Sequence, residues 1–86
     1  MYQIRTASRR VEKEIADLPR QVRDRIIQAI HGLATEPRPH GARKLSGEMH
    51  GAWRIRVGDY RVLYDIDDDH KLIVLLAVLH RREAYR

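Results

Sequence analysis

A cluster of arginines lies in the segment WRIRVGDYRVLYDI, which spans residues 53–66. Arg54 and Arg56 precede the dipeptide Gly58-Asp59, and Arg61 follows it. A guanidinium group is permanently charged and presents a planar fork of donors that matches a phosphate. If these arginines share one surface, they can bind a phosphate group between them.

The register of a β-hairpin decides whether the arginines share a surface. Gly58 and Asp59 suit a two-residue turn between two alternating strands. This turn pairs Arg56 with Arg61, and paired residues lie on the same face of a hairpin. The opposite face is then apolar or aromatic and consists of Trp53, Ile55, Val57, Tyr60, Val62 and Tyr64. Like charges directly opposite cost about 0.2 to 1 kcal/mol, which favours an anion between them; a merely solvated sheet face is the alternative.

The apolar face of the hairpin needs a covering layer, and the first half of the chain predicts two helices. After the N-cap candidate Ser8, a first short helix is predicted by the spacing of Val11, Ile15 and Leu18. A second helix over about residues 19–35 is predicted by the stripe Val22, Ile26, Ile30 and Leu33. It begins at Pro19 and ends before Pro37. We expect the two helices to form an antiparallel hairpin after a short edge strand at residues 2–4.

The remaining segments predict an irregular loop, an acidic turn and a last strand. Residues 37–51 are rich in Gly, Pro and His, as in a loop that crosses to the sheet. Residues 67–70 form a solvated turn, and residues 72–79 are apolar at every position, as in a central strand covered on both faces. The expected class is therefore α+β with the order β-α-α-β-β-β, in one domain over residues 1–86.

Composition limits the choice of partner and compartment. The chain has 86 residues, no cysteine and a formal net charge of +5, which favours a polyanionic partner. Without cysteine, the fold cannot depend on disulfides or thiolate zinc sites. Neither a membrane-spanning segment nor a signal peptide is visible, so we expect a cytoplasmic protein without a membrane partner.

Other catalytic patterns are weak. The five histidines have no metal-ligand spacing, and we expect neither a metal nor another cofactor. His80 stands at the end of the last strand beside Arg81, where it could exchange a proton near neutral pH. An ordinary strand-end residue is the alternative for His80.

Three motifs together resemble a known family. They are KLSG at residues 44–47, WRIRVGDYRVLYDI at 53–66 and VLHRREAY at 78–85. The chain resembles the RelE toxins of bacterial toxin-antitoxin systems, within the RelE/ParE superfamily, over nearly its whole length. The resemblance implies a helical hairpin packed on a curved, mainly antiparallel sheet. It also implies an endoribonuclease that cuts mRNA in the ribosomal A site and so inhibits translation and growth.

The resemblance also implies site residues. The catalytic positions of such toxins fall here on Arg54, Arg56, Arg61, Arg81 and Tyr85. Lys44 matches a further basic residue, and we assign it to RNA binding together with Arg43. Relatives of the best-studied branch carry lysines at positions 54 and 56, whereas guanidinium is a poor proton shuttle. We therefore expect His80 to act as the general acid or base.

The implied mechanism is metal-free: the 2′-hydroxyl of the RNA attacks the adjacent phosphorus. The implied partners are a cognate antitoxin, whose acidic segment wraps the basic face, and operator DNA contacted through that antitoxin. Two other functions stay open. One is a ParE-like toxin that inhibits DNA gyrase, and the other is a non-catalytic nucleic-acid-binding module, for which charge alone suffices.

Overall fold

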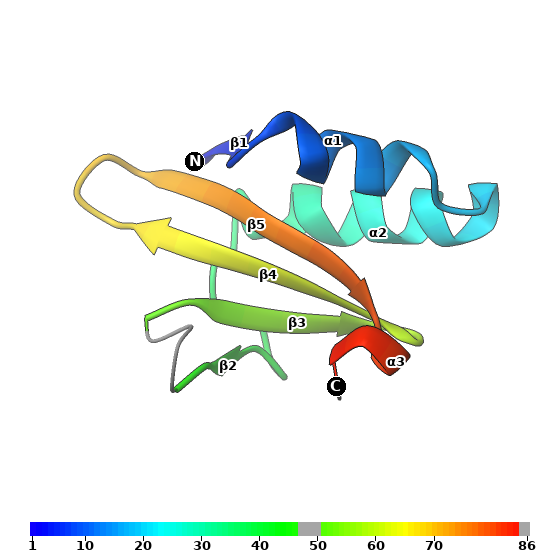
Figure 1. The fold of residues 1–86 in the computed structure, drawn as a ribbon. Coiled ribbons are helices and arrows are strands. Elements are labelled where there is room, and N and C mark those ends of the chain that lie inside the picture. The colour runs from blue at the N-terminus through cyan, green and yellow to red at the C-terminus, as the bar shows by residue number, and fades with distance from the viewer. Residues whose placement is uncertain (47–50, 85–86) are drawn as a thin grey trace.

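A computed structural model describes residues 1–46 and 51–84. The elements follow the order β1 (Gln3–Thr6), α1 (Arg9–Ala16), α2 (Arg20–Leu33), β2 (Arg43–Lys44), β3 (Trp53–Val57), β4 (Tyr60–Asp67), β5 (Leu72–His80) and α3 (Arg81–Ala84). Helices α1 and α2 run in opposite directions on one side of the sheet (Figure 1). The predicted α+β order is confirmed, and β2 and α3 are additions to it. In the described residues, no helix is both long and apolar enough to cross a membrane.

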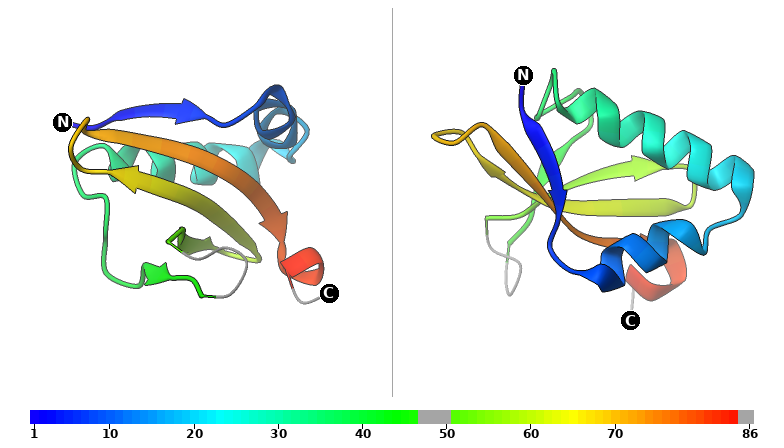
Figure 2. Two further views of the ribbon diagram at one scale, coloured as in Figure 1. Left: turned by 60° about the vertical axis from the view of Figure 1, so that its left-hand side comes forward. Right: turned by 90° about the horizontal axis from the view of Figure 1, so that it is seen from above.

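The five strands form one sheet in the order β1-β5-β4-β3-β2. β1 is parallel to β5, and the other neighbours are antiparallel. The sheet is strongly twisted and curves around the two helices (Figure 2). β5 is interior, as predicted, but only its helix-facing residues Ile73, Leu75 and Val78 are buried. Both helices lie on one side of the sheet, so the residues on the other side of β5 are only partly covered.

The β3–β4 hairpin has the predicted register. Arg56 pairs with Arg61, Ile55 with Val62, and Val57 with Tyr60. Gly58 has a φ of +60°, a backbone conformation that glycine adopts without strain. Glycine at the first central position is typical of the type II′ turns that match the twist of a hairpin. The turn thus fixes which side chains of the two strands lie on the helix side.

The hydrophobic core lies between the helices and the apolar face of the sheet. Its fully buried members come from both layers and include Val11, Ile26, Leu33, Val62, Tyr64 and Ile73. The Tyr64 hydroxyl donates a hydrogen bond of 2.8 Å to the carbonyl oxygen of Pro37. Burial raises the pKa of Tyr64 to about 12. The bond anchors the start of the loop that leads from α2 to the sheet.

The helix ends differ slightly from the prediction. Ser8 occupies the N-cap of α1 but its side chain makes no capping bond, and Pro19 is the N-cap of α2 instead of its first residue. α2 ends at Leu33, two residues before the predicted end. After Leu33 the chain forms a turn, in which the backbone nitrogens of Thr35 and Glu36 donate to the carbonyl oxygen of Gly32.

The acidic turn after β4 connects three distant segments. Asp68 accepts a hydrogen bond of 2.6 Å from the Tyr2 hydroxyl. It also pairs with both terminal nitrogens of Arg38, at 2.8 and 3.3 Å, and the Arg38 guanidinium lies 5.3 Å from the centre of the Trp53 ring. The turn is exposed as predicted, but its carboxylate also links the N-terminus, the crossing loop and the sheet.

These contacts predict a loss of stability in acid. Hydrogen bonds from Arg38 and then Tyr2 lower the pKa of Asp68 below its usual 3.8. A carboxylate whose pKa is lowered in the folded state stabilises the fold above its unfolded pKa, and this contribution is lost as the pH falls through the folded value. We expect the melting temperature to fall between about pH 5 and pH 2 less steeply in Asp68→Asn than in the natural chain. Thermal unfolding at a series of pH values measures both slopes, and equal slopes would contradict the prediction.

Candidate anion-binding site

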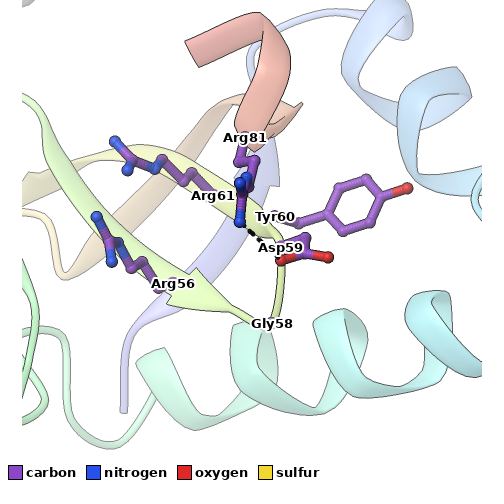
Figure 3. A pocket seen from close by; sticks show the side chains of 6 residues that line it. All are labelled: Arg56, Gly58, Asp59, Tyr60, Arg61 and Arg81. Atoms are coloured by element: carbon purple, nitrogen blue, oxygen red, sulfur yellow. Dashed lines mark ion pairs between the residues drawn. The ribbon is translucent and has the colours of Figure 1, made fainter. Parts of the chain in front are cut away.

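Three arginines border one cavity at the turn end of the β3–β4 hairpin. The cavity has a volume of about 330 Å³ and is lined by Arg56, Gly58, Asp59, Tyr60, Arg61 and Arg81. Arg56 and Arg61 extend in the same direction from neighbouring strands, and Arg81 approaches from the start of α3 (Figure 3). The ring of Tyr60 points away from the arginines, so this residue lines the cavity near its backbone (Figure 3). The side chains around the cavity therefore carry three positive charges and one negative charge.

Arg81 reaches the cavity because β5 contains a bulge. Leu63 pairs with Ala77 whereas Tyr64 pairs with Leu75, so Leu76 is an extra residue on β5. The bulge shifts the rest of β5 by one position and brings Arg81 beside Asp59. The Arg81 backbone nitrogen donates a hydrogen bond of 2.7 Å to the Asp59 carbonyl oxygen. The guanidinium also lies 3.9 Å from the Asp59 carboxylate, which holds it near the hairpin turn.

Arg54 shares the sheet face of Arg56 but does not line this cavity. Its exposed fraction is 9%, the lowest of any charged residue that the structure describes. Arg43 is paired with Arg54, and Lys44 with Trp53, on the two-residue strand β2. Both β2 side chains are exposed. Arg43 therefore extends the basic face from Arg54 toward the outer edge of the sheet, whereas Lys44 lies on the other face, with Trp53.

His80 lies on the other face of the sheet from Arg61. It pairs with Tyr60, and their rings meet edge to face with centres 5.1 Å apart. His80 borders a separate cavity together with Glu14, Asp17, Leu18, Pro19, Tyr60 and Val78. Its Nδ1 lies 3.2 Å from the Arg82 backbone nitrogen, which donates to it at the start of α3. The structure thus brings Arg56, Arg61 and Arg81 together but does not bring His80 to them, and Tyr85 lies outside the described residues.

Two residues near the arginines were not among the predicted site residues. Asp59 was assigned only to the turn, although a turn residue between two arginine-bearing strands is placed to contact whatever they bind. His40 lines a second cavity that also borders Arg56. Nothing in the local pattern around His40 marks it, because its position depends on how the crossing loop folds back.

The arrangement is suited to an anion with several oxygens. Arg56 and Arg61 extend side by side from two strands, and Arg81, at the start of the helix after β5, lines the same cavity. Each can donate two parallel hydrogen bonds to a phosphate. The Asp59 carboxylate, 3.9 Å from the Arg81 guanidinium, places one negative charge beside the three positive charges of the cavity.

Comparison with known proteins identifies the family. The family model described as the ParE toxin of the type II toxin-antitoxin system parDE matches residues 5–85. The toxin RelG of Mycobacterium tuberculosis is 36% identical over 75 residues, which cover 86% of this chain and 85% of RelG. The chain belongs to the RelE/ParE superfamily of type II toxins. The toxin RelE of the same organism is 30% identical over 75 residues, which cover 86% of this chain and 76% of that toxin.

Solved structures of RelE/ParE toxins share the fold. The RelBE2 toxin-antitoxin complex of M. tuberculosis contains a chain with a TM-score of 0.81 and 31% identity, covering 93% of this chain and 98% of that chain. A chain of the archaeal RelE-RelB complex of Pyrococcus horikoshii has a TM-score of 0.80 at 30% identity, and the match covers 93% of this chain and 94% of that chain. The isolated RelE toxin of Escherichia coli has a TM-score of 0.79 at 25% identity, and the match covers 99% of this chain and 92% of that toxin. The predicted RelE-like fold is therefore confirmed.

Proposed function

We propose that this toxin is an endoribonuclease that cuts mRNA in the ribosomal A site. The observation that carries the proposal is the cavity in which Arg56 and Arg61, directly opposed on two strands, are joined by Arg81. Guanidinium groups that line one cavity can together bind an anion with several oxygens. A phosphate of the RNA backbone supplies that anion, and the formal net charge of +5 attracts the polymer over a longer range.

The proposed reaction uses the RNA as its own nucleophile. The 2′-oxygen forms a bond to the adjacent phosphorus while the bond from phosphorus to the 5′-oxygen breaks. One proton leaves the 2′-hydroxyl and one reaches the departing 5′-oxygen, so the products are a 2′,3′-cyclic phosphate and a 5′-hydroxyl. Arg56 and Arg61 stabilise the extra charge on the phosphorane oxygens, and Arg81 orients the phosphate. Arg54 supports the basic surface and Arg43 extends it along the RNA, and Lys44 binds RNA from the outer edge of the sheet.

The roles of the other predicted site residues follow from their places. Because His80 faces away from the three arginines, we propose that it positions Arg81 through the start of α3. Tyr85 keeps its proposed role in stacking on a base or orienting the attacking sugar. With guanidinium groups as the main catalytic residues, the toxin depends on the ribosome to preset the geometry of the RNA. We therefore expect poor cleavage of free RNA oligomers.

We also propose a cognate antitoxin as the partner in the cytoplasm. The M. tuberculosis and P. horikoshii relatives form RelBE2 and RelE-RelB complexes. An acidic antitoxin segment fits the arginine face of this chain by charge, and the complex contacts operator DNA through the antitoxin. Such a segment competes with RNA for the same cavity.

The ParE-like alternative has one specific observation in its favour, since the matching family model is described as ParE. A toxin of that kind damages DNA through gyrase and needs no phosphate cavity. Expression of this chain in growing cells, followed by mapping of 5′ ends on transcripts with and without translation, separates the two functions. We expect growth arrest with cuts inside translated codons. DNA damage without RNA cuts would select the gyrase function, and unhindered growth would contradict both.

A further inference from the structure

A second cavity borders the arginine cavity and has a different character. It has a volume of about 410 Å³ and is lined by Ala29, Gly32, Pro39, His40, Gly41, Ile55 and Arg56. These residues come from the second half of α2, the crossing loop and β3. Apart from His40 and Arg56, the lining residues have no polar side-chain atoms. Arg56 is the residue that the two cavities share.

Two glycines leave this cavity open. Gly41 has a φ of +92°, so its backbone explains why the residue is glycine. Gly32 lies inside α2 without a positive φ, and a methyl group added to it would meet no atom within 4 Å. Gly32 is exposed and is the last residue but one of α2, and the space beside it is open. A larger side chain at this position would occupy part of the cavity.

We propose that this second cavity binds a nucleobase of the RNA whose phosphate lies among Arg56, Arg61 and Arg81. The inference rests on the proposed function and extends it to a base site. A base and the phosphate of its nucleotide are separated only by the sugar, so their two sites must lie close together, and Arg56 lines both cavities. A planar base stacks on an imidazole ring or a guanidinium plane, which His40 and Arg56 provide. The apolar walls of Pro39 and Ile55 suit the faces of the base.

Binding of an RNA that cannot be cut tests the site without requiring catalysis. The probes are 2′-O-methyl tetranucleotides of each single base type and the same tetranucleotides with one abasic position, titrated into the protein and followed by NMR. We expect the natural chain to bind one of the intact probes about tenfold more tightly than its abasic form, the size of one base-stacking contact. Gly32→Leu should remove this difference and leave binding of the abasic probe unchanged. Arg56→Ala should weaken both probes.

Controls separate the site from the stability of the helix. Gly32→Ala should raise the melting temperature, since alanine favours the helix, and it should weaken binding of the intact probe. Gln21→Leu adds the same side chain as Gly32→Leu at an exposed position of α2 that borders neither cavity, and it should bind both probes as the natural chain does. If Gly32→Leu weakens binding of the intact and the abasic probe equally, or weakens binding of neither, the proposed base site is wrong.

The outcomes also distinguish this inference from the proposed function. Base-dependent binding without RNA cuts in cells would leave the base site and overturn the nuclease function. RNA cuts without base-dependent binding would overturn the base site alone. Gly32→Leu could instead leave binding of the tetranucleotides unchanged and weaken only the binding of a synthetic peptide of alternating Glu and Leu. In that case the cavity binds a protein partner and the inference is wrong.

Discussion

Replacing Arg61 with alanine should reduce cleavage of translated mRNA by about 10²- to 10³-fold while the protein stays folded. Arg61 faces Arg56 across the hairpin and lines the arginine cavity, where a donor aimed at the phosphorane oxygens stabilises the transition state. Arg61 is not part of the buried hydrophobic core, so we expect the variant to stay folded. Cleavage of a ribosome-bound message measures the effect, and thermal unfolding confirms the fold.

A matched control distinguishes the loss of a catalytic group from the loss of one positive charge. Arg20→Ala removes the same charge at an exposed position in the first turn of α2, away from the cavity. We expect Arg20→Ala to cut RNA within about twofold of the natural chain, because one surface charge changes the attraction to RNA only slightly. A non-catalytic nucleic-acid-binding module would not cut RNA, and both substitutions would weaken its RNA binding alike. Equal effects of the two variants would therefore count against the enzyme.

The register of the arginine hairpin was predictable because two independent signals agree. Apolar and basic residues alternate before Gly58-Asp59, and after it an apolar or aromatic residue occupies every second position from Tyr60 to Ile66. A slip of one residue would bury the arginines and expose the aromatic residues, which the core does not permit. The structure has this register, with Ile55, Val62 and Tyr64 buried on the helix side. The alternation in the sequence and the burial of the apolar face therefore specify the same register.

The position of His80 and Arg81 was not predictable for the opposite reason. The turn after β4 pairs Asp67 with Leu72. Uninterrupted pairing from that point would place Leu79 opposite Tyr60 and put His80 on the arginine face. Residues 72–79 are apolar throughout, so no alternation in the sequence reveals that Leu76 is an extra residue. The bulge exchanges the faces of the two side chains, and Arg81 instead of His80 reaches the cavity.

Contacts between residues that are far apart in the sequence could not be predicted from the local residue pattern either. The acidic turn was predicted as solvated, yet Asp68 bonds Arg38 and Tyr2, which are 30 and 66 residues away. Likewise, His40 reaches Arg56 only because the crossing loop folds back along α2, where Tyr64 anchors its start. Such features depend on the tertiary arrangement and not on the residue pattern near each group.

Substitutions at the end of β5 should separate the arginine from the histidine. Arg81→Ala should lower cleavage of ribosome-bound mRNA by about 10²-fold, because it removes a guanidinium donor from the phosphate cavity. His80→Ala should lower it by less than about tenfold, since loss of one capping bond typically costs about 1 kcal/mol and the ring faces away from the arginines. Single-turnover cleavage rates of the two variants measure the contrast.

The substitution His80→Asn decides between a positioning role and proton transfer. The asparagine side-chain oxygen can accept the Arg82 backbone N–H that His80 Nδ1 accepts now, so it should restore the start of α3 and the place of Arg81. An amide cannot shuttle a proton near neutral pH, so a general acid or base at this position would lose activity as completely in His80→Asn as in His80→Ala. We expect His80→Asn to cleave at nearly the natural rate and to keep the natural pH profile. Equal loss in both variants, with an altered pH profile, would assign the proton to His80 despite its place across the sheet.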